Sequence, residues 1–133
     1  MNASLWLTRT QVNEMTRHID SLAPLEACGL LAGRAGRVEA VIPITNAEQS
    51  PVKFRMDPLE QLHAFEWIDE NELELLGIFH SHPSGPETAS PTDLAEAAYE
   101  VVHIILSPAG SSWQVRGFLF QNGKASEANL HVE

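Results

Sequence analysis

The stretch Leu75-Leu76-Gly77-Ile78-Phe79-His80-Ser81-His82-Pro83 leads from an apolar run directly into two histidines. Its first five residues form a short, continuous apolar run, which is typical of a buried central strand. Successive side chains of an extended chain point to opposite sides, so His80 and His82 project the same way while Ser81 points away. We therefore expect a pair of imidazoles at the end of a central strand, where rigid backbone meets a pocket.

A third polar group follows a short distance along the chain. After a turn-rich segment at residues 83–89 comes Ser90-Pro91-Thr92-Asp93, which is typical of a helix start with Ser90 as the N-cap and Asp93 in the first turn. Two histidines and one aspartate are ligands that a catalytic zinc site uses, and they leave a fourth position for water. The sequence thus predicts His80, His82 and Asp93 as ligands of one catalytic Zn2+ ion.

Two other interpretations of these residues remain open. His80 and His82 could be polar residues on a loop near a sheet edge, with Ser90 and Asp93 forming an ordinary helix cap. Capping, however, does not explain the paired histidines that precede it. Two histidines and a carboxylate also bind non-haem iron, although nothing else in the sequence indicates an oxygenase.

The spacing of the whole motif resembles that of the JAMM (MPN-plus) metallopeptidases. It consists of His-Ser-His-Pro, seven residues between the second histidine and a serine, then two residues and an aspartate. The segment from Pro24 to Gly33 resembles the part of that family that carries a catalytic glutamate, and Met56-Asp57-Pro58 is similar to its bacterial members. The resemblance extends from about residue 4 to about residue 120.

Carried over to this chain, the resemblance assigns roles to five residues. It implies that His80, His82 and Asp93 bind zinc, that Glu26 is the general acid and base, and that Ser90 helps to hold the scissile carbonyl or its oxyanion. A different mechanism, with Cys28 as a thiol nucleophile, is open in principle. Because Cys28 lies within an apolar run, we expect it to be a small buried side chain instead.

Length and composition limit the classes of protein to which the chain can belong. With 133 residues, we expect one domain over residues 1–133, large enough to bury a core. The single cysteine excludes an internal disulfide, and we find no signal peptide or membrane-spanning run, so a cytoplasmic location without a membrane partner is expected. The net charge of −10 without a Lys/Arg cluster argues against nucleic acid as a partner.

Hydrophobic spacing and cap signals divide the chain into helices and strands. We expect a strand at residues 4–7, a helix capped by Thr8 that runs to about Leu22, and a hairpin of strands at residues 27–33 and 38–44. His103 is expected to be a core or sheet-face histidine. The other expected elements are a short strand at Phe54 and Met56, a helix from Asp57 to about Glu70 that buries Leu59, Leu62, Phe65 and Ile68, a helix from Ser90 through Ala97 or Tyr99, and strands at residues 75–79, 101–106, 113–120 and 128–132.

These elements predict an α/β fold with a mixed sheet. The resemblance further implies a cytidine-deaminase-like three-layer sandwich, with a mostly antiparallel sheet and helices on both sides. JAMM relatives hydrolyse peptide or isopeptide bonds next to the C-terminal Gly-Gly of ubiquitin-like proteins. Among them, this chain resembles the short bacterial members, some of which release cysteine from a ubiquitin-like sulfur-carrier protein. That is the expected activity; a general isopeptidase acting on other protein conjugates, a non-catalytic MPN interaction module and a homodimer are left open.

Overall fold

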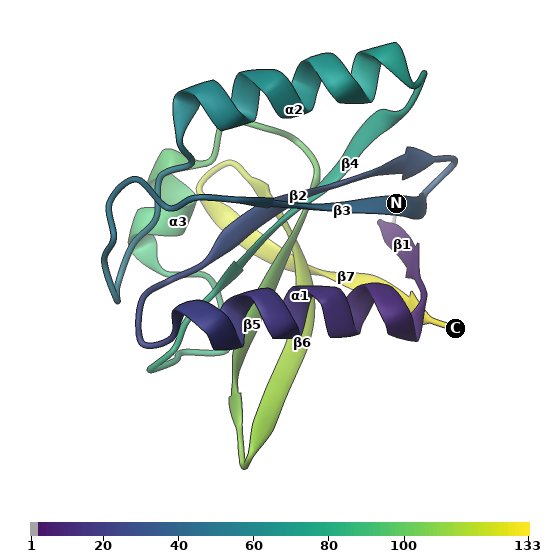
Figure 1. Ribbon diagram of the computed structural model, residues 1–133. Helices are drawn as coiled ribbons and strands as arrows, with labels where there is room; N and C mark the ends of the chain where they lie inside the picture. Colours follow the sequence, from purple (N-terminus) through teal and green to yellow (C-terminus); the bar gives the residue numbers. More distant parts are fainter. Residues whose placement is uncertain (1–2) are drawn as a thin grey trace.

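The structure is a computed structural model that describes residues 3–133 and has an α/β fold. Helices are interspersed among the strands in the first part of the chain, and three consecutive strands end it (Figure 1). No helix in the described range is long and apolar enough to cross a membrane. The elements are β1 (Ser4–Leu7), α1 (Arg9–Leu22), β2 (Cys28–Arg34), β3 (Arg37–Ile44), α2 (Pro58–Glu70), β4 (Glu74–Ser81), α3 (Pro91–Glu96), β5 (Val102–Ala109), β6 (Ser112–Gln121) and β7 (Lys124–Val132).

The strands form one mixed sheet in the order β1-β3-β2-β4-β5-β6-β7, and β7 pairs back to β1. Four of the pairings are antiparallel and three are parallel. The predicted α/β class and mixed sheet are confirmed. The closure of the sheet was not foreseen, and it arises because the short strand β1 pairs in parallel with both β3 and β7.

The helices α1 and α2 lie on opposite sides of the central strands (Figure 1). Side chains of β2 and β4 alternate between two apolar clusters, because successive residues of a strand point to opposite faces. Leu31 and Phe79 belong to the cluster that contains the buried face of α1, whereas Leu30 and Ile78 pack in the cluster that contains α2. Both faces of these two strands are therefore buried.

The antiparallel pairing of β2 with β4 sets the position of the predicted site residues. Cys28 lies opposite His80, and beyond this pair the Ser81 N–H donates to the Ala27 carbonyl at 3.0 Å. Continuing the same register places Glu26 opposite His82. The predicted acid and the two predicted histidine ligands thus come from one end of two neighbouring strands.

The buried face predicted for α2 is partly wrong. Leu59 and Leu62 are 60% and 53% exposed, and the helix instead buries Ala64 and Ile68, with Phe65 partly covered. Apolar residues occur on more than one side of this helix, so hydrophobic spacing alone does not determine which side faces the sheet.

Several element boundaries also differ from those expected. The strand predicted at Phe54 and Met56 is only an isolated bridge between Asn46 and Met56. The helix α3 ends at Glu96, earlier than predicted, whereas β5 continues to Ala109 and β7 begins at Lys124 because their hairpins extend the ladder toward each turn. Asn122 and Gly123 form the turn between β6 and β7, with positive φ at both residues, as a tight hairpin requires.

The two sides of α2 provide a test of the packing. Ile68→Ala should lower the free energy of unfolding by about 2–5 kcal/mol, because it leaves a cavity between the helix and the sheet. Leu62→Ala on the exposed side should change it by about 0.5 kcal/mol or less. Urea unfolding of the two variants measures both values, and a comparable loss in Leu62→Ala would contradict this assignment of the buried face.

Candidate metal centre

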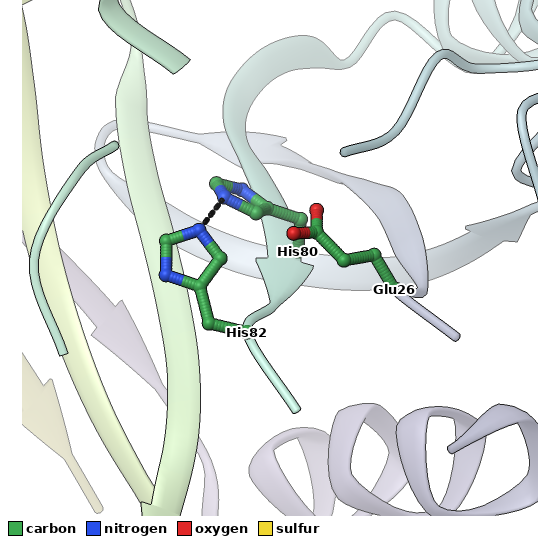
Figure 2. A group of neighbouring side chains, drawn as sticks. All are labelled: Glu26, His80 and His82. Atoms are coloured by element: carbon green, nitrogen blue, oxygen red, sulfur yellow. Dashed lines mark hydrogen bonds between the residues drawn. The ribbon is translucent and has the colours of Figure 1, made fainter. Parts of the chain in front are cut away.

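The two predicted histidine ligands meet at the end of β4. His80 and His82 are 1% and 3% exposed, and their Nε2 atoms are 3.0 Å apart. Figure 2 shows the two rings with these nitrogens facing each other and the carboxylate of Glu26 directed toward them. The Ser81 side chain points elsewhere and accepts a hydrogen bond from the Ala27 N–H. The alternation expected from the sequence is therefore present.

Asp93 brings the third group to the same point. It lies in the first turn of α3, where Ser90 Oγ accepts from the Asp93 N–H and Asp93 Oδ2 accepts from the Ser90 N–H, which makes a capping box. The same Oδ2 is 3.2 Å from His80 Nε2 and 3.0 Å from His82 Nε2. The structure thus brings together all three residues that the sequence predicts as ligands.

The spacing of these three atoms fits a small tetrahedral cation. Ligands placed tetrahedrally about 2.1 Å from zinc lie roughly 3.4 Å from one another, close to the 3.0–3.2 Å observed. Burial lowers the pKa of His80, so its ring is neutral and able to donate a lone pair. Burial alone would raise the pKa of Asp93, but its contacts with the two histidines and the Ser90 N–H hold that pKa well below its usual range and keep the carboxylate ionised.

Surrounding groups fix the orientation of the histidine rings. His82 Nδ1 lies 2.8 Å from the Pro86 carbonyl, a partner that holds the proton on Nδ1 and leaves the Nε2 lone pair directed at the centre. The ring of His80 stacks on Phe54, with the ring centroids 4.5 Å apart. Neither partner was recognised from the sequence, because each meets its histidine through the folding of a loop rather than through a motif.

Glu26 lies beside the histidines as a second buried carboxylate. One of its oxygens lies within 4.8 Å of a ring nitrogen of both His80 and His82. The residue is 3% exposed, and its Oε1 has no hydrogen-bond partner among the described residues. Burial raises the pKa of Glu26 to about 7; His82 opposes this increase and the nearby Asp93 carboxylate adds to it. Such a group can both accept and release a proton near neutral pH.

Both buried carboxylates lie beside the histidines. Asp93 Oδ2 is 3.0–3.2 Å from the two Nε2 atoms, and a Glu26 oxygen lies within 4.8 Å of a ring nitrogen of each histidine. Asp93 as the third ligand and Glu26 as the proton carrier therefore stay predictions of the sequence; the unpartnered Oε1 of Glu26 and its pKa near 7 suit the second role.

The alternative residues do not join this cluster. Cys28 is fully buried, its Sγ contacts the Ile44 carbonyl at 3.4 Å, and burial raises the pKa of its thiol to about 12, so it is not an activated nucleophile. His103 stacks on Phe120 with the ring centroids 4.1 Å apart, in keeping with a sheet-face histidine.

Comparison with known proteins identifies the family. Residues 8–116 match the family described as prokaryotic homologs of the JAB domain, Prok-JAB. The chain belongs to this family. One relative, from Thermus thermophilus, is described as a "Probable TtuB-protein conjugate cleaving protease" and is 40% identical over 121 residues, 90% of this chain and 78% of the relative. Another, the CysO-cysteine peptidase of Mycobacterium tuberculosis, is 34% identical over 125 residues, 91% of this chain and 86% of the relative.

A solved structure supports the same fold. The solution structure of a Desulfitobacterium hafniense protein is similar to this chain with a TM-score of 0.87 and 36% identity, over 97% of this chain and 92% of the other. The resemblance to JAMM metallopeptidases that the motifs indicated is confirmed. The chain is a hydrolase of that metallopeptidase class, with its buried histidines and a carboxylate as the metal site.

Metal analysis of variants tests which carboxylate is the ligand. His82→Ala and Asp93→Ala should lower zinc content well below one ion per chain, because each removes a ligand from an open three-ligand site. Glu26→Gln, which keeps the size of the side chain, should retain zinc. Elemental analysis after gel filtration gives the stoichiometry, and loss of zinc in Glu26→Gln with retention in Asp93→Ala would exchange the two roles.

Proposed function

We propose that this chain hydrolyses the peptide bond that follows the C-terminal Gly-Gly of a ubiquitin-like protein. The leading substrate is a sulfur-carrier protein that bears a C-terminal cysteine. The observation that supports this most strongly is the convergence of His80, His82 and Asp93 at 3.0–3.2 Å beside the unpartnered Glu26 carboxylate. This arrangement has both parts that hydrolysis needs, a Lewis-acid site and a proton carrier.

In this proposal His80, His82 and Asp93 hold zinc. The ion, when bound, supplies a Lewis acid that acidifies water and polarises a carbonyl group. Glu26 accepts a proton from the attacking water and then delivers it to the nitrogen of the leaving amine, which restores the carboxylate. Its burial keeps the pKa near neutrality, so both transfers are accessible at cellular pH.

Ser90 completes the proposed set of catalytic residues. Its Oγ accepts the Asp93 N–H, which leaves the hydroxyl proton free to be donated to another group. We assign this proton to the scissile carbonyl oxygen, where negative charge develops during attack. Ser90 therefore has two roles, since the same oxygen also caps α3.

A cavity of about 530 Å³ next to the histidines is large enough for an extended peptide tail. His80 and Asp93 line it together with Phe54, Tyr99 and other residues from helices, strands and loops. The names of the two relatives describe cleavage of a TtuB–protein conjugate and of CysO-cysteine. The first name describes cleavage of a protein conjugate and the second a peptidase that acts on a cysteine adduct, which is the kind of bond that we propose for this chain.

Two alternatives differ from this activity. A general isopeptidase would accept other protein conjugates at the same site. A non-catalytic MPN interaction module is disfavoured, because Glu26, His80, His82, Ser90 and Asp93 are all present and four of them meet within one buried cluster.

Three further proposals accompany this function. The fold is of the cytidine-deaminase-like three-layer class, the chain is one domain over residues 1–133, and its location is cytoplasmic.

The proposal predicts a metal-dependent release of cysteine. A ubiquitin-like sulfur carrier with a cysteine after its Gly-Gly terminus should lose the mass of that residue when incubated with the zinc-loaded protein. A zinc chelator should abolish the loss, and Glu26→Gln should reduce the rate at least a hundredfold because it lacks the proton carrier. Mass spectrometry of the carrier follows the reaction. An intact carrier together with cleavage of a lysine-linked conjugate would support the general isopeptidase instead.

Ser90→Ala separates the catalytic role of Ser90 from its capping role. The variant should keep its zinc and lose about tenfold or more in kcat, because an oxyanion donor is removed. It should also lose about 1 kcal/mol of stability as the cap is lost. Thr8→Ala is the matched control, since Thr8 caps α1 in a capping box of the same kind. If both variants keep wild-type kcat, Ser90 is only a cap.

A further inference from the structure

Asn46 is a buried amide within a loop whose neighbouring residues are exposed. It is 5% exposed, while Thr45, Ala47 and Glu48 on either side face solvent. Its side chain makes four hydrogen bonds: Nδ2 donates to the carbonyls of Glu26 and Lys53 at 2.9 and 3.1 Å, and Oδ1 accepts from the N–H groups of Glu48 and Arg55 at 3.0 Å each. This uses both donors and both acceptor positions of the amide.

One of these bonds reaches the backbone of Glu26, twenty residues earlier in the chain. The Glu26 N–H in turn donates to the Ser50 carbonyl at 2.8 Å, within the loop that Asn46 organises. On the following residue, the Ala27 N–H donates to Ser81 Oγ at 2.9 Å. The backbone of Glu26 is therefore held on both sides by the loop, while β2 begins only at Cys28.

We propose that Asn46 is a positioning residue for Glu26. It acts by fixing the backbone of Glu26, from which the catalytic side chain extends. This inference rests on the proposed role of Glu26 as the proton carrier. The Glu26 carboxylate has no partner for its Oε1, so contacts of the carboxylate itself do not determine where that oxygen points. The bonds to its backbone fix the peptide from which the side chain extends, and Asn46 supplies the one to the Glu26 carbonyl.

The chemistry of the position explains why an amide is needed. Two N–H groups and two carbonyls converge on it, so the side chain must offer acceptors on one end and donors on the other. An aspartate has the same shape but only acceptors when it is ionised, so it would face the carbonyls of Glu26 and Lys53 without a proton to donate. Such a change releases Glu26 while keeping the two bonds on the other side of the loop.

The test is Asn46→Asp, with Asn71→Asp as the matched control. Asn71 makes the same kind of bond from its Nδ2 to the Trp67 carbonyl, but it is exposed at the end of α2. We expect Asn46→Asp to retain its zinc and its KM and to lose about 10–100-fold in kcat, as is typical when a group that orients a catalytic residue is removed. Asn71→Asp should keep the wild-type values.

The decisive comparison repeats the change in a Glu26→Gln background. If Asn46 acts through Glu26, Asn46→Asp should lower the residual rate by less than about twofold there, because the two effects are not additive. An equal loss in both backgrounds would overturn the proposal, since it would show that Asn46 acts independently of Glu26. Undiminished kcat in the single variant would overturn it as well.

A second readout does not depend on turnover. The amide protons of Glu26 and Ala27 should exchange with deuterium faster in Asn46→Asp than in the wild type, and unchanged exchange would contradict the proposal. If Asn46→Asp does not fold, Asn46→Ala, which adds no charge, takes its place; failure of both to fold would show a purely structural role. If the protein cleaves no conjugate, the proposed function is refuted. The exchange measurement would still test whether Asn46 holds the backbone of Glu26.

Discussion

The pairing of β2 with β4 is the constraint on which the rest of the site depends. Gly29 lies opposite Phe79, and a Cβ at Gly29 would come within 2.4 Å of the Phe79 ring, so the ring fills the place where a side chain would otherwise be. A shift of one residue would bring a side chain against the ring and exchange the residues that belong to the two apolar clusters. The packing that fixes this register also brings Glu26 and His82 to the same end of the ladder.

Two buried carboxylates at this end differ in their surroundings, and the difference gives them different chemistry. Asp93 Oδ2 lies 3.2 Å and 3.0 Å from the Nε2 atoms of His80 and His82 and accepts a hydrogen bond from the Ser90 N–H, and these contacts stabilise the ionised form. Glu26 has burial without comparable donors, so its proton is held to about pH 7. Proteins often place two carboxyl groups in environments that move their pKa values apart. One group then stays an anion, and the other can carry a proton.

Features encoded within a few residues were predicted from the sequence. The helix caps at Thr8 and Ser90 and the paired histidines depend on local spacing, and each lies as expected. The buried side of α2 was partly wrong, because Leu59 and Leu62 are apolar yet exposed and only the position of the sheet distinguishes them from Ile68. The closed sheet and the hydrogen bond from Asn46 to Glu26 join segments that are distant in the sequence. Such contacts cannot be predicted from the spacing of neighbouring residues.

The site is built half on the sheet and half on connecting segments. His80 and the residue that pairs with it are held in a ladder with both faces buried, whereas α3 has six residues and none of them is buried. A short helix without an apolar face gains little from packing, so the Asp93 carboxylate, 5% exposed, is a principal link between α3 and the histidines. The free energy of metal binding is coupled to the free energy of ordering the segment that carries a ligand. Among the three proposed ligands, Asp93 is therefore the one whose position would depend most on a bound ion.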